Sequence, residues 1–236
     1  MQALIDCLNS EVVDWANFEK LLRDFDKKKS IGYNNELVPS RRQILGWYVP
    51  DLRALARSVR ADKVLAIIDS MPQNYHEESV ILALLLGRIK SVEVLMPRLE
   101  RFISTIDNWA TCDILCGELK IVDRCLPTFW NSVNVWINNC AEYMERFAIV
   151  LMMKYYINGG YIDRVLLTAK GRISRHYYVN MALAWLYAEA CVRFGDKVLA
   201  TLRKYKINKD VIKFTKEKVR DSYRVPKEIK QAIMDL

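Results

Sequence analysis

The chain has 236 residues, with 36 Lys and Arg against 28 Asp and Glu, so its formal net charge is +8. Hydrophobic residues make up 52% of the sequence, which excludes a disordered chain and is enough for one large or two small domains. The 8 Gly and 6 Pro are too few for the many tight turns of a β-sandwich or barrel. No apolar run approaches the roughly 18 residues that span a bilayer, and the first residues lack the pattern of a secretory signal. We therefore expect a soluble cytoplasmic protein with no membrane partner.

The first part of the chain predicts a short helix followed by a loop. Lys27–Pro39, KKKSIGYNNELVP, is the most irregular stretch and predicts a loop between this N-terminal helix and the rest of the fold. Pro50, followed by Asp51, suits the first turn of a helix, where the missing N–H costs nothing.

The remainder of the chain reads as helical almost throughout. Apolar residues recur at helical spacing in Ser79–Ile89, Glu142–Tyr156 and Tyr177–Val192, and no segment alternates in the manner of a strand. Prolines are expected to mark the boundaries of the segments. These boundary prolines are Pro50, Pro72, Pro97, Pro127 and Pro226.

Helix pairs recur at a nearly constant interval. Their predicted starts lie near Asn74, Asn108, Glu142, Ser174 and Asn208, at intervals of about 34, 34, 32 and 34 residues. A period in this range predicts stacked helical hairpins, because a single hairpin cannot bury its apolar face alone. The tetratricopeptide signature is missing, which favours degenerate HEAT-type hairpins. We expect an all-α, HEAT-like helical repeat solenoid over residues 1–236, a single domain with a concave basic face.

The six cysteines favour reduced thiols, because the chain is not a short secreted framework. Cys112 and Cys116 lie one helical turn apart, a spacing that can contribute two zinc ligands. The sequence has only two histidines and no second close cysteine pair, so small buried hydrophobic residues are the favoured interpretation. We expect no metal site and no cofactor.

A candidate for chemistry lies in the segment Ile106–Asp113, IDNWATCD. If Asp107 or Asn108 caps a helix, Trp109 and Asp113 are at positions i and i+4 and share one face. The alternative is that Trp109 packs in the core and Asp113 is solvated.

Two more residues extend this candidate. Arg146 opens the apolar helical segment that begins at Phe147, and Trp185 lies in the middle of a later one. With the predicted period, Trp109, Arg146 and Trp185 lie at similar heights in successive repeats and can converge on one face. Individually, each residue is also compatible with packing or with a surface charge.

The basic excess is concentrated near the C-terminus. From Arg193 to Leu236 there are 13 basic and 6 acidic residues. Either these charges form a solvated helical face, or they bind a polyanion, since a positive surface raises both affinity and encounter rate for phosphates. Lys213, Lys216 and Lys218 are the candidate contacts in this stretch.

As a set, several segments resemble the DNA alkylation repair family of AlkD-like DNA glycosylases, a family of HEAT-like repeats. The resemblance runs from about Leu37 to Arg224. The segments that carry it are Ile44–Arg53 (ILGWYVPDLR), Ile106–Asp113, Glu145–Phe147, Tyr177–Trp185 and Ser222–Arg224.

The resemblance implies excision of N3- or N7-alkylated purines from duplex DNA. The aromatic, carboxylate, arginine and second aromatic positions of that family's cleft fall on Trp109, Asp113, Arg146 and Trp185. In this interpretation the two tryptophans hold the cationic nucleotide, Asp113 stabilises the oxocarbenium-like sugar, and Arg146 contacts a flanking phosphate.

Two alternatives stay open at this point. The first is a non-catalytic nucleic-acid-binding member of the same family, and the second is a protein-binding helical scaffold. We expect a monomer whose partner is double-stranded DNA with alkylated bases.

Overall fold

A computed structural model describes residues 1–25, 37–172 and 174–236. Within these ranges the regular secondary structure is helical, and the strand-like contact there is an isolated bridge between Gln43 and Tyr75. The predicted all-α, HEAT-like helical repeat fold is confirmed. Among the described helices, none is long and apolar enough to cross a membrane. Most of the predicted loop Lys27–Pro39 lies outside the described residues.

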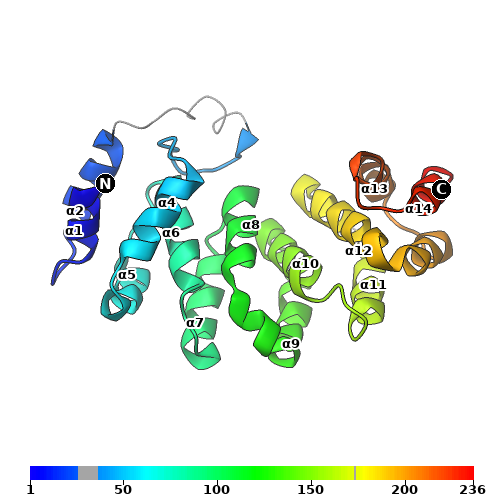
Figure 1. Ribbon diagram of the computed structural model, residues 1–236, viewed down its shortest axis with the longest axis horizontal. Helices are drawn as coiled ribbons and strands as arrows, with labels where there is room; N and C mark the ends of the chain where they lie inside the picture. Colours follow the sequence, from blue (N-terminus) through cyan, green and yellow to red (C-terminus); the bar gives the residue numbers. More distant parts are fainter. Residues whose placement is uncertain (26–36, 173) are drawn as a thin grey trace. The chain divides into compact units, whose positions relative to one another are not determined.

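The helices form two compact units, Met1–Ile121 and Val122–Leu236 (Figure 1). The first unit contains α1 (Gln2–Leu8), α2 (Trp15–Asp24), α4 (Val49–Ser58), η1 (Ala61–Lys63), α5 (Val64–Ser70), α6 (His76–Leu86), α7 (Val92–Ile103) and α8 (Trp109–Glu118). The second unit contains α9 (Leu126–Trp136), α10 (Glu142–Tyr155), α11 (Ile162–Lys170), α12 (Tyr177–Lys204), α13 (Lys209–Asp221) and α14 (Lys227–Met234). A further 3-10 helix, η2, covers Lys120–Arg124.

The hairpins begin where the sequence periodicity predicted them. The helices α6, α8, α10, α12 and α13 each start within three residues of the expected position. Two of the starts have side-chain caps: Asn108 accepts a hydrogen bond from the N–H of Thr111, and Asn208 accepts one from the N–H of Asp210. Such caps satisfy N–H groups that have no partner inside the helix, so the recurring asparagines are part of the repeat signal.

The prolines match the predicted boundaries with one exception. Pro50 and Pro127 lie in the first turns of α4 and α9, and Pro226 is the N-cap of α14. Pro97 was wrongly predicted to end a segment, because it lies inside α7. The helix continues past it because the face carrying Leu95 and three later residues is buried, which compensates for one lost backbone hydrogen bond.

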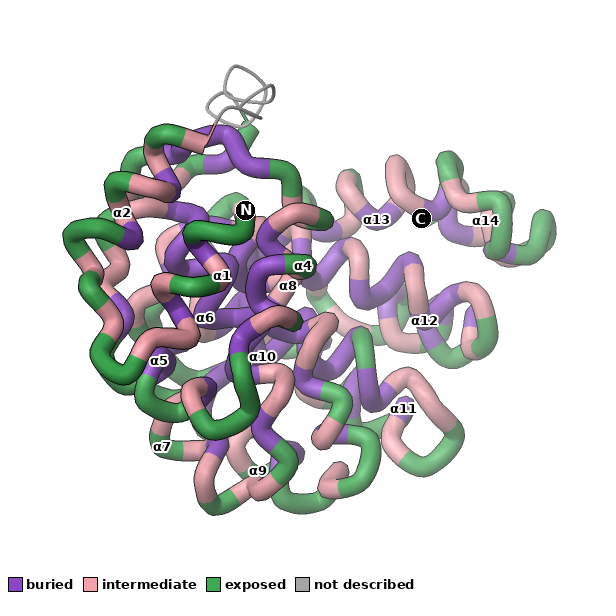
Figure 2. Tube along the Cα trace, turned by 60° about the vertical axis from the view of Figure 1, so that its left-hand side comes forward, coloured by how far each residue is buried: buried purple, intermediate pink, exposed green. Residues whose placement is uncertain are grey.

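In the first unit, α6 packs against both α4 and α8. Every residue of α6 is buried, which follows from its almost uninterrupted apolar run Val80–Leu86 (Figure 2). The first helices of successive hairpins therefore lie side by side, with α6 as the central member.

The second unit repeats this arrangement with α10, α12 and α13, where α12 packs against the other two. The backbone of α12 leaves helical geometry at Phe194, where φ is −131° and ψ is 36°, so the helix is kinked. At the next residue, a Cβ on Gly195 would lie 2.6 Å from the side chain of Ile229, so glycine permits the close approach of α14. The part of α12 after the kink takes the place of the second helix of its hairpin.

Candidate functional site

The predicted site residues all lie on the first helices of hairpins. Trp109 and Asp113 lie on α8, Arg146 on α10, Trp185 on α12, and Lys213, Lys216 and Lys218 on α13. In each unit these helices are the ones that pack side by side. The structure thus places Trp109 and Asp113 one turn apart in the first unit, and the other predicted residues in the second.

Trp109 is the first residue of α8 and is half-buried rather than enclosed in the core. Its indole N–H donates a hydrogen bond of 2.9 Å to the carbonyl of Leu37. Asp113 follows one turn later and is also half-buried. The expected shared face is therefore formed, and it presents an aromatic ring and a carboxylate that are both partly accessible.

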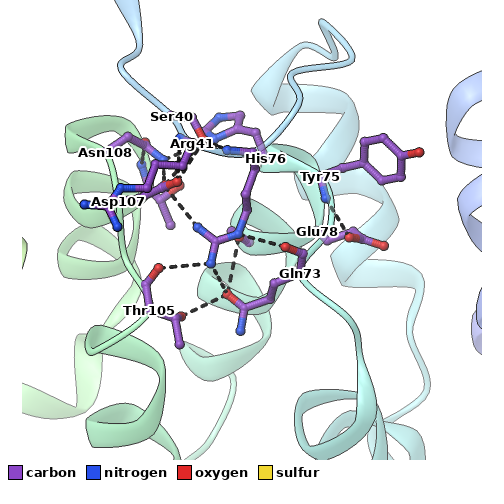
Figure 3. A network of polar contacts seen from close by, with 12 residues as sticks. Ser40, Arg41, Gln73, Tyr75, His76, Glu78, Thr105, Asp107 and Asn108 are labelled. Atoms are coloured by element: carbon purple, nitrogen blue, oxygen red, sulfur yellow. Dashed lines mark hydrogen bonds and ion pairs between the residues drawn. The ribbon is translucent and has the colours of Figure 1, made fainter.

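A buried polar network fixes the start of α8 (Figure 3). The carboxylate of Asp107 lies 3.0 Å from the guanidinium of Arg42 and accepts a 2.7 Å hydrogen bond from the N–H of Arg41. Burial alone would raise the pKa of Asp107, but the hydrogen bonds from Asn108 and Arg41, together with the charge of Arg42, lower it. The same guanidinium donates to the carbonyls of Gln73 and Thr105. Asp107, two residues before Trp109, is therefore tied through Arg42 to the segments that contain Gln73 and Thr105.

A second carboxylate anchors the loop that precedes α4. Glu77, only 1% exposed, accepts hydrogen bonds of 2.8–3.2 Å from the backbone N–H groups of Leu45, Gly46 and Trp47. Gly46 has φ of 88°, a conformation that favours glycine, and this lets three successive N–H groups converge on one carboxylate. The motif ILGW is thus a loop wrapped around Glu77.

Sequence reasoning missed this role of Glu77 and the role of Arg42. Two consecutive acids, Glu77 and Glu78, at the start of an otherwise apolar helix were the available signal. The carboxylate of Glu78 accepts from the N–H groups of Asn74 and Tyr75, and burial raises its pKa to about 7.

The far end of α8 is also held. Glu118 forms an ion pair with Arg53 of α4, and its Cβ lies so close to Gly87 that an added methyl group there would clash at 2.5 Å. Cys112 and Cys116 are fully buried in the same helix, as expected for small hydrophobic residues. With both ends fixed, α8 is a rigid support for Trp109 and Asp113.

In the second unit, Arg146 is only 5% exposed. It donates a 2.7 Å hydrogen bond to the carbonyl of Tyr178, so it ties α10 to the first turn of α12. Beside it, burial raises the pKa of Glu145, while Arg172 at 3.9 Å acts in the opposite direction. The structure thus gives Arg146 a structural contact, and the phosphate contact stays a prediction from the sequence.

Trp185 is half-buried and lines a cavity of about 500 Å³ between α12 and the end of α13. Lys218 and Arg224 line the same cavity, together with Glu189 and the exposed ring of Tyr223. Both guanidinium Nη atoms of Arg224 donate to the carboxylate of Glu189, at 2.8 and 2.6 Å. The structure thus brings Trp185 together with one of the three predicted lysines.

The other two lysines lie elsewhere on α13. Lys213 and Lys216 line a separate cavity of about 310 Å³ beside Met234. The ammonium group of Lys216 donates a 2.9 Å hydrogen bond to the carbonyl of Met234, near the end of α14. The sequence grouped the three lysines, whereas the structure separates Lys218 from the other two.

Comparison with known proteins supplies a family. The model of the family described as "DNA alkylation repair enzyme" matches residues 17–216. No match was found among curated proteins or among solved structures. The matched range extends from α2 into α13, and it includes Trp109, Asp113, Arg146 and Trp185. Within the described residues, no group of three or more His, Cys, Asp or Glu is placed to hold a metal ion.

Proposed function

Because this chain belongs to the family of DNA alkylation repair enzymes and so has a role in the repair of alkylated DNA, we propose that it is a DNA glycosylase. The proposed substrate is duplex DNA with positively charged N3- or N7-alkylated purines. The observation that carries the proposal is the pair Trp109 and Asp113, both partly accessible on a helix whose two ends are fixed.

The chemistry of the lesion suits these two side chains. An alkylated purine carries a positive charge, so its bond to the sugar is already weakened. When the bond between C1′ and the base nitrogen breaks, the electron pair leaves with the base, which becomes neutral, and positive charge develops on the sugar. Water then adds at C1′ and loses a proton, which leaves an abasic site.

Asp113 supports this reaction through its charge. A carboxylate close to the sugar stabilises the oxocarbenium-like transition state, and it is held in place before the reaction begins. The network around Asp107 and Asn108 supplies this preorganisation, because it fixes the start of α8 one turn from Asp113. Trp109 would hold the cationic nucleotide by stacking and cation–π attraction, about 0.5–2 kcal/mol, and Trp185 would offer the same kind of contact to a nucleotide at its own unit.

Binding of the DNA backbone is assigned to the basic second unit. Residues 122–236 contain 20 Lys and Arg against 11 Asp and Glu. Lys218 lies at the Trp185 cavity, and Arg146 lies on the neighbouring helix α10. In this proposal both contact phosphates of the DNA backbone, and Lys213 and Lys216 contribute attraction from elsewhere on α13.

The proposal is tested by release of base from a duplex that contains 7-methylguanine. The wild-type protein is expected to release the free base, measured by chromatography. Asp113→Asn keeps the size and polarity of the side chain but removes its charge, so the excision rate should fall tenfold or more. Affinity for the duplex should be retained or rise slightly, because a negative charge close to phosphates is removed.

Asp123→Asn is the matched control. It also removes one negative charge, but from an exposed position on η2, and it should excise at the wild-type rate. Absence of base release by the wild type, with all three proteins binding the duplex, would overturn the glycosylase proposal in favour of a non-catalytic DNA-binding protein.

A further inference from the structure

The short connection between α13 and α14 presents an aromatic ring to solvent. Tyr223 has a relative accessible surface of 103%, so the side chain makes almost no contact with the rest of the protein. A single exposed aromatic residue is ordinary on a protein surface. What distinguishes Tyr223 is how firmly the backbone on both sides of it is held.

Three contacts fix this connection. Arg224 forms the two-pronged ion pair with Glu189 of α12, at 2.8 and 2.6 Å, a geometry that restrains both side chains. The N–H of Arg224 donates a 3.2 Å hydrogen bond to the hydroxyl of Ser222. The next residue, Val225, is buried at 4% exposure. The backbone at Tyr223 is therefore restrained on both sides, whereas its ring is free of intramolecular packing.

The ring of Tyr223 lines the same 500 Å³ cavity as Trp185. This volume falls within the range of about 300–1,000 Å³ that small-ligand pockets occupy. The cavity also contains two cationic side chains, Lys218 and Arg224, and two carboxylates, of which Glu189 pairs with Arg224 and Asp221 pairs with Arg220 outside the cavity lining. Two aromatic rings with cations beside them match the chemistry of a nucleotide, which has a flat base and a charged phosphate.

We propose that this cavity binds one unpaired nucleotide of a DNA strand, with the ring of Tyr223 stacked on its base and Lys218 facing its phosphate. An unpaired base fits better than a paired one, because a base inside the duplex is already stacked on both faces and costs energy to extrude. The Arg224–Glu189 ion pair is the positioning element that keeps Tyr223 at the rim. The inference rests on the proposed function in taking DNA as the ligand and Lys218 as a phosphate contact, and what it adds is the unpaired nucleotide and the ring of Tyr223.

The test compares affinities for two DNA probes, without any excision step. One probe is a fully paired undamaged duplex, and the other is the same duplex with a single unpaired thymidine. Fluorescence anisotropy at fixed salt gives Kd for each, and the ratio of the two values is the readout. The wild type should favour the bulged duplex by about fivefold or more, as expected for stacking on one base.

Three variants assign this preference to the ring. Tyr223→Ala should abolish it, whereas Tyr223→Phe should keep it, because stacking needs the ring and not the hydroxyl. Tyr205→Ala is the matched control: Tyr205 also lies among lysines, with the ammonium of Lys170 at 3.6 Å from its ring centre, but it lines a different cavity. It should keep the preference. Both Tyr223 variants should unfold at the wild-type temperature, since the ring of Tyr223 is solvent-exposed, whereas Tyr205→Ala should unfold at a slightly lower one because it loses the contact with Lys170.

Several results would overturn this inference. They are equal affinities of the wild type for both probes, loss of the preference in Tyr223→Phe, and an equal loss in Tyr205→Ala. None of them bears on base release from 7-methylguanine DNA, which is measured separately. Conversely, a wild type that releases no base but prefers the bulged duplex through Tyr223 would support the cavity and overturn only the glycosylase proposal.

Discussion

Residues 1–121 contain 16 Lys and Arg against 17 Asp and Glu, whereas residues 122–236 contain 20 against 11. The first unit uses several of its charges internally: Arg42 pairs with Asp107, and Arg53 pairs with Glu118. In the second unit the lysines of α13 reach surface cavities instead. The carboxylate proposed for chemistry thus lies in the neutral unit, and the charge proposed for DNA attraction lies in the basic one.

This difference shows that positioning and attraction can be perturbed separately. The ion pairs of the first unit fix the two ends of α8. Removing one of them should therefore change the free energy of unfolding and the position of α8. The charges of the second unit act on a polyanion at a distance, and their effect appears as affinity that depends on salt. Each of the following variants tests one side of this separation.

The largest expected effect is on stability in the first unit. Asp107→Ala removes a carboxylate that is 8% exposed and leaves the guanidinium of Arg42, at 16% exposure, without its ionic partner. Breaking a buried pair from one side costs about 3–5 kcal/mol, so the free energy of unfolding should fall by roughly 3 kcal/mol in urea titrations.

Asp69→Ala is the matched control for this variant. Asp69 also pairs with two arginines, Arg98 and Arg101, but its side chain is 38% exposed. Its loss should cost less than about 1 kcal/mol, because water replaces the partners of an exposed pair. Equal losses in the two variants would contradict the view that the Asp107 network is what anchors α8.

A smaller effect is expected from the pH dependence of Glu78. Its folded-state pKa is about 7, above the ordinary 4.5, so the folded protein holds a proton that the unfolded chain releases. The free energy of unfolding contributed by this group is fully present below about pH 4.5 and is lost as the pH rises to about 7. Glu78→Gln keeps an acceptor for the N–H groups of Asn74 and Tyr75 and stays neutral. It should therefore gain on the order of 2 kcal/mol relative to the wild type between pH 4.5 and pH 8.

Glu93→Gln provides the comparison with an exposed acid in the first turn of a helix. A hydrogen bond from Ser91 lowers the pKa of Glu93. The pH dependence is therefore opposite to that of Glu78: the contribution of Glu93 to the free energy of unfolding is present above its unfolded pKa and is lost in acid. Urea titrations at several pH values measure both variants. A Glu78→Gln profile parallel to that of the wild type would show that Glu78 is ionised at neutral pH.

The sequence was sufficient for the fold because its signals are local. Asparagine caps, apolar periodicity and the interval of about 34 residues predicted the hairpin starts, and the structure confirms them. Pro97 was predicted wrongly, because whether a proline ends a helix depends on the packing of the face around it.

The candidate site was predictable only in part, for a physical reason. The face shared by Trp109 and Asp113 follows from their spacing on one helix. The contact of Asp107 with Arg42 joins residues 65 positions apart, and the ion pair between Arg224 and Glu189 joins residues 35 apart. Such contacts depend on how loops and helices meet, and no local pattern encodes them. The separation of Lys218 from Lys213 and Lys216 likewise depends on where α14 docks.

The smallest expected effect is on the affinity of the second unit for DNA. It distinguishes the charge at one cavity from the total charge of the unit. Lys218→Ala removes one cation at the Trp185 cavity, whereas Lys213→Ala with Lys216→Ala removes two from the cavity beside Met234. If DNA lies at the Trp185 cavity, the single variant should lower duplex affinity several-fold and reduce the slope of log K against log salt by about one. The double variant should lose less, because Lys213 and Lys216 line the cavity beside Met234 and not the Trp185 cavity. Overall charge alone predicts the reverse order, since two charges are removed instead of one. Anisotropy titrations between low and moderate salt therefore decide whether the basic unit attracts DNA as a whole or binds it at the cavity that Trp185 lines.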